Sequence, residues 1–234
     1  MPSNMLGPVN THSNSHLLQN ICECTRCPRL VKWREQVARE KVARYRDCEY
    51  WGKPVPSFGT ISSRLLIVGL APAAHGGNRS GRMFTGDRSG DWLYRSLHKF
   101  SFASQPNSID RDDGQILVDC YISAIIHCAP PANKPDPKEI SNCRGYLVQE
   151  LELLRRLRVI VALGRLAFDQ IFTLLPSGGT KKRPSFHHGL EIECERDIRL
   201  LASYHPSQQN TFTGKLTESM FDAIFQRARE ILER

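Results

Sequence analysis

The sequence lacks the features of a membrane protein or a secreted protein. No run of about 18 apolar residues occurs, so no membrane span is expected. The chain does not open with a basic start followed by an apolar stretch, so no secretory signal is expected. It also lacks an internal repeat and a linker that would split it. The 234 residues therefore predict a cytoplasmic protein with a flexible tail over residues 1–18 and one domain over residues 19–234.

Eight cysteines are present, and without an export signal we expect thiols or metal-bound thiolates rather than disulfides. Two pairs stand out: Cys24 with Cys27, and Cys128 with Cys143. Four converging thiolates hold zinc or an iron–sulfur cluster. Their number does not separate these two, but the 14-residue gap in the second pair is unlike common zinc-ribbon spacing. The remaining cysteines are expected to be structural: Cys22, Cys48, Cys120 and Cys194.

The formal net charge of +8 at pH 7 favours an acidic partner, and nucleic acid is the commonest one. Arg79, Arg82 and Arg88 fall in one predicted loop, and Thr180–Arg183 forms another basic loop. These loops are either solvated surface or contacts for phosphate groups.

Four short aliphatic runs without polar alternation predict buried strands: Leu65–Gly69, Tyr121–Ile126, Val159–Leu163 and Leu200–Tyr204. Helical patterns separate or follow them, over Asp91–Lys99, from Asp136 onward, from Gly164 to about Leu175, and over Leu216–Leu232. Such alternation predicts an α/β fold with a central, mainly parallel four-stranded sheet that helices cover on both faces.

In such sheets ligands bind beyond the carboxyl ends of the strands. The most unusual loops of the sequence follow those ends: Gly69–Pro72, Cys128–Pro131, Gly164–Arg165 and Tyr204–Ser207. The sequence therefore predicts a functional site along one edge of the sheet.

At these loops the chain resembles the uracil-DNA glycosylase superfamily, and most of all family 5, the UDGb enzymes. The resemblance rests on four blocks together with both cysteine pairs: Gly69–Gly76, Gly81–Asp87, Cys128–Lys134 and His205–Thr211. It implies a three-layer α/β/α sandwich and one 4Fe–4S cluster, which Cys24, Cys27, Cys128 and Cys143 would hold. It also implies removal of damaged bases from double-stranded DNA.

The family pattern implies roles for the residues that surround a flipped base. Phe84 would stack on the ring, although it could equally be a core residue. His205 would donate a hydrogen bond to the uracil O2 as negative charge develops on the departing base, although a lone histidine is often structural. The residues expected to hold the base are Gly69, Leu70, Ala71, Ala73, Phe84 and Asn133.

A second set of residues resembles the DNA-contacting parts of the family. Gln208, Gln209 and Asn210 would fill the gap that the flipped nucleotide leaves, with Phe212 as a possible wedge. The residues expected to grip DNA through their charge are Arg82, Arg88, Lys181 and Lys182.

The sequence departs from related families at two places. Related glycosylases carry a carboxylate or amide where this chain has Leu70 and Ala71, so Asp87 is the preferred substitute and Asn133 the other candidate. Asp87 could instead cap the following helix. Family 4 enzymes have an asparagine where this chain has Ala124, which predicts a less selective base site that also accepts hypoxanthine or xanthine.

These expectations combine into a monofunctional hydrolase of N-glycosyl bonds that leaves an abasic site, because no lysine is evidently placed for Schiff-base strand cleavage. We expect a monomer that repairs nucleoid DNA. The alternative is a non-catalytic iron–sulfur protein that binds damaged or abasic DNA.

Overall fold

The computed structural model describes residues 11–175 and 184–234. Lys181 and Lys182, expected to contact DNA, lie outside the described residues. None of the helices in the described part is both long enough and apolar enough to cross a membrane.

The centre of the fold is a six-stranded sheet with the order β1-β3-β2-β4-β6-β5. The four predicted strands form its parallel middle. The expected count of four is wrong, because a short antiparallel strand adds to each edge. The strands are β1 (Phe58–Gly59), β2 (Leu65–Gly69), β3 (Cys120–Ala124), β4 (Val159–Leu163), β5 (Glu191–Cys194) and β6 (Ile198–Ser203).

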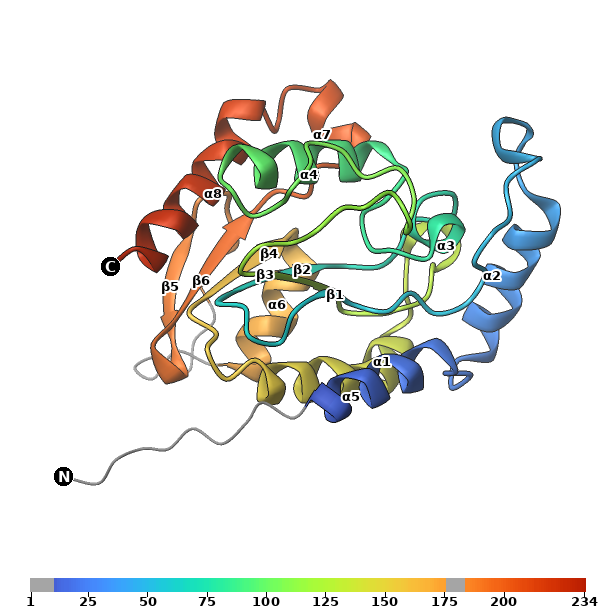
Figure 1. Cartoon of the computed structure of the whole chain (residues 1–234), viewed down its shortest axis with the longest axis horizontal. Coiled ribbons are helices and arrows are strands. Elements are labelled where there is room, and N and C mark those ends of the chain that lie inside the picture. Colours follow the sequence, from blue (N-terminus) through green and yellow to red (C-terminus); the bar gives the residue numbers. More distant parts are fainter. Residues whose placement is uncertain (1–10, 176–183) are drawn as a thin grey trace.

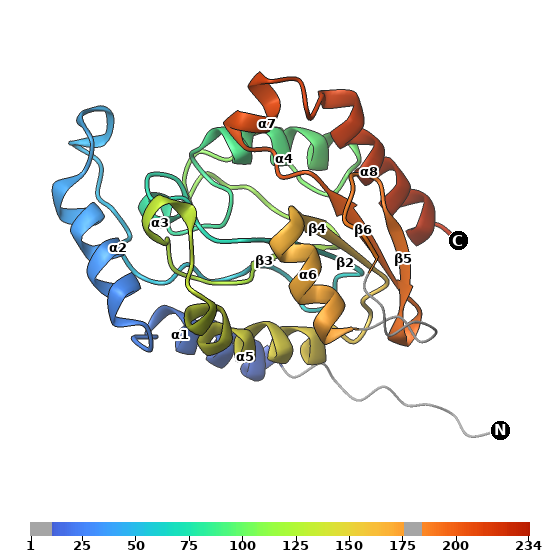
Figure 2. The ribbon, with the colours of Figure 1, turned by 180° about the vertical axis from the view of Figure 1, so that it is seen from behind.

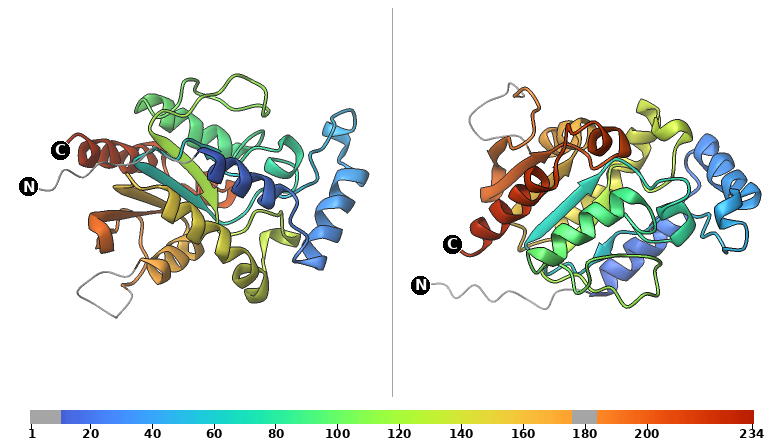
Figure 3. Two further views of the ribbon diagram at one scale, coloured as in Figure 1. Left: turned by 60° about the horizontal axis from the view of Figure 1, so that its bottom comes forward. Right: turned by 90° about the horizontal axis from the view of Figure 1, so that it is seen from above.

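Helices cover both faces of this sheet, with α4 and α8 on one face and α5 and α6 on the other (Figures 1 and 2). The alternation of strand side chains explains both layers: Leu65 and Ile67 of β2 pack toward α4 and α8, and Leu66 and Val68 pack toward α5 and α6. The view from above shows α4 and α8 side by side (Figure 3, right). The predicted three-layer α/β/α sandwich is confirmed.

The α-helices of the described chain are α1 (Thr11–Cys22), α2 (Pro28–Glu40), α3 (Gly77–Ser80), α4 (Arg88–Lys99), α5 (Pro137–Leu153), α6 (Arg165–Leu174), α7 (Gln208–Phe212) and α8 (Glu218–Leu232). The described chain also has three short 3₁₀ segments: η1 (Ala43–Tyr45), η2 (Pro131–Asn133) and η3 (Glu195–Asp197).

The start of α5 is fixed by the sequence signal that predicted it. The Asp136 backbone N–H donates to the Glu139 carboxylate at 2.8 Å, which satisfies a group at the helix start. Arg29 of α2 donates to the same carboxylate from two nitrogens, Nε to Oε1 at 2.8 Å and Nη2 to Oε2 at 2.7 Å. This bidentate pair joins two helices that are 110 residues apart in sequence. It thereby brings the first cysteine pair toward Cys143.

Helix α1 corrects one expectation. Residues 11–18 lie within this helix, so the predicted flexible tail is wrong for that part of the chain. The side chains of Leu17 and Ile21 are buried against Tyr146 of α5, and the Tyr146 hydroxyl donates to the Asn20 carbonyl at 3.2 Å. Figure 3 shows α1 lying along α5. Burial of two apolar residues against α5 stabilises a helix whose composition is otherwise polar.

Candidate functional site

The loops that carry the unusual sequence blocks meet along one edge of the sheet. Strands β2, β3, β4 and β6 are parallel, so their carboxyl ends point the same way. We call this edge, with the loops 70–87, 125–136, 164 and 204–212, the carboxyl rim. It is the place where α/β proteins usually bind ligands.

Phe84 has an unusual backbone at this rim. Its φ is 52°, a left-handed conformation that is costly for a bulky residue and is found where the surroundings enforce it. A Cβ added to Gly69 would lie 2.6 Å from the Phe84 ring, and one added to Gly90 would lie 1.9 Å from the Phe84 carbonyl oxygen. Two glycines therefore make room for Phe84. The ring is 8% exposed and belongs to a core cluster, as the alternative interpretation expected, yet it also borders the rim.

His205 is the partner of Phe84 across the rim. The two ring centroids are 6.1 Å apart with an interplanar angle of 31°. The Asn210 side-chain amide donates to the His205 carbonyl at 2.9 Å and fixes the turn after β6. Burial lowers the pKa of His205 to about 4, so its imidazole is neutral at pH 7. A neutral imidazole carries one N–H that can donate to a base.

Asp87 caps α4, as the alternative interpretation predicted. Its Oδ1 accepts from the Gly90 backbone N–H at 2.9 Å. Its Oδ2 lies over Gly76, where a Cβ would be 1.9 Å away. Burial raises the pKa of this carboxyl. The capping role is confirmed, while a role in placing water stays a prediction.

The remaining base-site candidates are held mainly through their backbone. The Gly69 and Leu70 carbonyls accept from Ile125 and Ile126 at 2.9 Å and 3.0 Å, which extends the β2–β3 pairing into the rim. The Ala73 carbonyl accepts from the backbone N–H groups of residues 76 and 78. The contacts of Gly69, Leu70, Ala71 and Ala73 with a base stay predictions.

Asn133 sits at the tip of η2. Its side chain is exposed, and both Asn133 and Ala132 have positive φ, at 55° and 51°. Its backbone N–H donates to the Pro130 carbonyl at 3.1 Å. None of the contacts of the described residues joins Asn133 to Phe84 or His205, so its catalytic and base-binding roles stay predictions.

Arg82, which was expected to contact DNA, is buried inside the protein instead. Its side chain is 5% exposed, and its guanidinium is fully engaged inside the protein. It forms an ion pair with Asp113 at 2.6 Å and donates to the hydroxyls of Ser108 and Thr85 at 2.5 Å and 3.1 Å. Since the sequence shows the charge of a residue and not its burial, the motif alone could not reveal this. Arg82 instead anchors the loop before Phe84.

The other predicted DNA-contacting residues of the described chain form part of the rim surface. Arg88 is exposed, and its guanidinium lies 4.4 Å from the ring centroid of Phe212, which is 67% exposed. Gln208 and Gln209 are exposed on α7. Asn210 differs, because its amide already holds the turn at His205.

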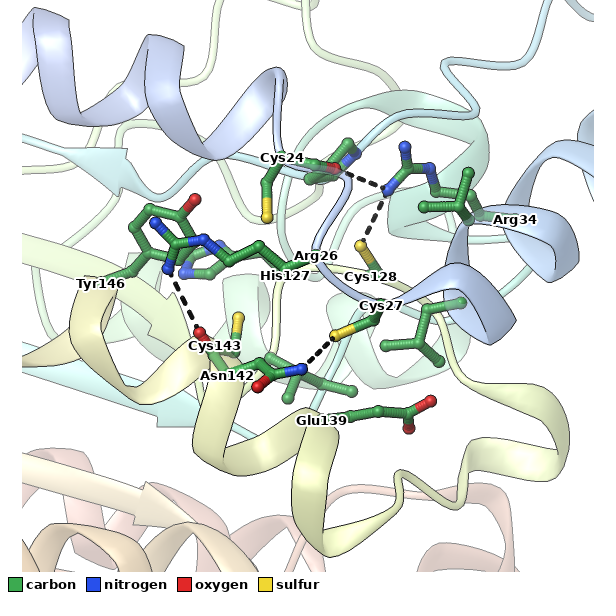
Figure 4. Close-up of a pocket in the computed structure, with 14 residues that line it drawn as sticks. Cys24, Arg26, Cys27, Arg34, His127, Cys128, Glu139, Asn142, Cys143 and Tyr146 are labelled. Carbon is green, nitrogen blue, oxygen red and sulfur yellow. Dashed lines mark hydrogen bonds between the residues drawn. The ribbon is translucent and has the colours of Figure 1, made fainter.

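The four cysteines of the two predicted pairs line one cavity between α2, α5 and the loop after β3 (Figure 4). Cys24 and Cys27 come from the segment between α1 and α2, Cys128 from the loop after β3, and Cys143 from α5. Within residues 11–175 and 184–234, no three His, Cys, Asp or Glu side chains form a group that could hold one metal ion. The sulfurs instead surround an open space.

Buried polar atoms around this cavity fit a charged group inside it. The side chains of His127 and Arg34 are 2% and 4% exposed, yet His127 Nε2 and Arg34 Nε have no hydrogen-bond partner in the described chain. Two other donors already point at sulfur: Arg34 Nη1 lies 3.1 Å from Cys128 Sγ, and the Asn142 amide lies 3.5 Å from Cys27 Sγ. Sequence reasoning missed these residues, although Arg34 follows Cys27 at a helical spacing of seven.

The sequence was compared with protein families and with known proteins. Residues 56–229 match the model of the uracil DNA glycosylase superfamily. The type-5 uracil-DNA glycosylase of Mycobacterium leprae is 49% identical over 90% of this chain and 92% of its own length. That of Thermus thermophilus is 45% identical over 92% of this chain and 96% of its own length. A type-4 uracil-DNA glycosylase of Archaeoglobus fulgidus is 32% identical over 65% of this chain.

The chain belongs to the uracil DNA glycosylase superfamily. Within it, relatives that cover most of both chains are type-5 enzymes, which confirms the family 5 resemblance and the prediction of a glycosidase.

Proposed function

We propose that this enzyme removes uracil and other deaminated bases, such as hypoxanthine and xanthine, from double-stranded DNA and leaves an abasic site. The observation that carries the proposal is the pairing of Phe84 with a part-buried, neutral His205 at the carboxyl rim. An aromatic ring and a neutral donor side by side suit a flat, hydrogen-bonding ligand that gains negative charge as it departs. The enzyme would act as a monomer and without strand cleavage.

The chemistry follows from the charge that develops when the N-glycosidic bond breaks. The target nucleotide leaves the duplex at a cost of a few kcal/mol, and the base packs against Phe84. The sugar gains oxocarbenium character, while the His205 N–H donates to the base oxygen that becomes negative. Asp87, two residues beyond the Phe84–Thr85 turn, would place the attacking water or stabilise the cation. The exposed Arg88 and Gln208 would contact the DNA around the lesion.

A 4Fe–4S cluster held by Cys24, Cys27, Cys128 and Cys143 completes the proposal. Four thiolates around a cavity suit a cubane core, which is wider than a single zinc ion. Burial raises the pKa of Cys128 to about 11 and that of Cys143 to about 12, so iron would have to displace their protons. When bound, the cluster would serve as a redox-passive crosslink between the segment that precedes α2, helix α5 and the loop after β3.

The breadth of substrates rests on Ala124. This residue ends β3 at the rim and is 1% exposed. Its methyl group has no donor or acceptor with which to read the edge of a base. Because buried hydrogen bonds are what reject wrong bases strongly, the site would tolerate deaminated purines.

Single-turnover base release from labelled duplexes that carry uracil, hypoxanthine or xanthine tests the proposal, with anaerobically purified protein. Release of uracil and of at least one deaminated purine is expected. Release of uracil alone would refute the broad specificity. Tight binding of abasic DNA with no base release would instead support the non-catalytic alternative.

The cluster is tested on the same preparation. Bound iron and absorbance at about 400 nm are expected, since zinc has a filled d shell and gives no such band. Zinc without iron would refute the cluster and leave the glycosylase proposal to the base-release assay.

A further inference from the structure

A buried arginine faces the cysteine cavity from the middle of α2. Arg34 is 4% exposed, and Figure 4 shows its guanidinium pointing toward Cys24 and Cys128. Arg34 Nη1 donates to Cys128 Sγ at 3.1 Å and to the Cys24 carbonyl at 3.3 Å. Arg34 Nε is buried and has no partner in the described chain. One side chain therefore reaches both cysteine segments at once.

The position of this cation requires a negative charge nearby. Burying a guanidinium without a counter-charge is strongly unfavourable. Among the described residues no carboxylate forms an ion pair with Arg34; Glu139, which lines the same cavity, is paired with Arg29. Arg26, the other arginine that lines this cavity, is exposed to solvent. The groups left to balance Arg34 are the sulfurs.

We infer that Arg34 is a positioning residue for the metal centre: it orients Cys128, ties that cysteine to the Cys24 segment, and offsets the negative charge of the four thiolates. The inference rests on the cluster proposed above. Groups that hydrogen-bond to metal ligands fix the ligands in place, and their loss typically weakens metal binding by about 10–100-fold. Arg34 provides such a contact from a helix that supplies no ligand of its own.

The backbone of Arg34 also reaches toward the carboxyl rim. Its carbonyl accepts from the Asn78 amide at 3.3 Å. Asn78 lies in α3, which follows the loop that ends at Gly76, and Gly76 lies against the Asp87 carboxylate. A change in α2 can therefore disturb the rim as well as the cysteine site. For this reason base release alone would not test the inference, and the metal itself must be followed.

The experiment compares Arg34→Gln and Arg34→Lys with a control, Arg39→Gln, which changes an exposed arginine on the same helix. Each protein is purified anaerobically, its iron is counted, and the loss of absorbance near about 400 nm is timed in excess chelator. We expect Arg34→Gln to lose iron about 10–100-fold faster than wild type. Arg34→Lys keeps the charge, so its rate of iron loss should lie between those of Arg34→Gln and wild type. Arg39→Gln should lose iron at the wild-type rate.

Melting temperatures separate this role from a general packing role. If Arg34 acts through the metal centre, Arg34→Gln lowers the melting temperature of the iron-loaded protein much more than that of the metal-free protein. Equal losses in both forms would overturn the inference. So would wild-type iron retention in Arg34→Gln, or iron loss in Arg34→Lys as fast as in Arg34→Gln. Wild-type protein that binds no iron would overturn the cluster and this inference together.

Discussion

The neutral state of His205 is open to a direct test. Because burial lowers its pKa to about 4, His205 should act as a hydrogen-bond donor and never as an imidazolium acid at physiological pH. We expect His205→Ala to slow single-turnover base release by about 10²–10³-fold, the usual effect of one preorganised electrostatic group. DNA affinity should change little, because the substitution alters the site that holds the base and not the contacts with DNA phosphates. His98→Ala, which changes an exposed histidine of α4, is the matched control.

The pH profile separates the neutral donor from the charged one. Between about pH 5 and about pH 8, no step in the rate constant of base release should belong to His205. An imidazolium acid would instead make the rate rise as the pH falls through about 6.5. A step near that pH in wild type that disappears in His205→Ala would refute our assignment.

The same pKa makes stability depend on pH. Below pH 6.5 the unfolded chain protonates this histidine, whereas the folded protein resists until about pH 4. The contribution of neutral His205 to the free energy of unfolding is therefore complete above pH 6.5 and is lost as the pH falls toward 4. At about 1.36 kcal/mol for each pH unit, the loss reaches about 3 kcal/mol. Urea unfolding should show this slope in wild type and its absence in His205→Gln.

Three further outcomes are expected. Asp87→Asn keeps a helix cap but removes the charge, so slower base release at an unchanged melting temperature would support a chemical role, whereas Asp87→Ala should also cost about 1 kcal/mol of stability. Glu150 is 1% exposed and accepts from the hydroxyls of Ser57, Tyr121 and Ser123. Glu150→Ala should therefore lower the free energy of unfolding in urea by about 3 kcal/mol, whereas Glu152→Ala, at an exposed position, should leave it unchanged. Arg88→Gln should flatten the logarithmic salt dependence of DNA binding by about 0.9, and an unchanged slope would show that Arg88 touches no phosphate.

The fold was predictable where local pattern and tertiary structure agree. The four apolar runs become the parallel strands, since only strands buried on both faces tolerate such sequences. Strand β5 was missed because its sequence, Glu191–Cys194, alternates acidic and apolar residues at an edge of the sheet. Helix α1 was missed because its stability comes from Leu17 and Ile21 packing on α5, a contact that local composition does not reveal.

The residue types of the site could be predicted from the sequence, but the orientation of the side chains could not always be predicted. The motifs placed Phe84 and His205 at the same edge of the sheet, and the structure brings the two rings together. They also suggested Arg82 for DNA, but its guanidinium turns inward to Asp113. Arg34 was missed despite its helical spacing from Cys27, because a buried arginine and a solvated one look alike in a sequence.

The bidentate pair between Arg29 and Glu139 has a consequence for the order in which the molecule is made. The two residues are 110 positions apart, so a ribosome releases the segment of the first cysteine pair long before its partners exist. Domains generally fold from the amino terminus during synthesis, yet here α2 gains its ion pair with α5 only after α5 has emerged. By then β2 and β3 have already left the ribosome. The segment of the first cysteine pair thus gains this link late, and where the cluster proposed above does not form, we expect proteases to reach this segment first.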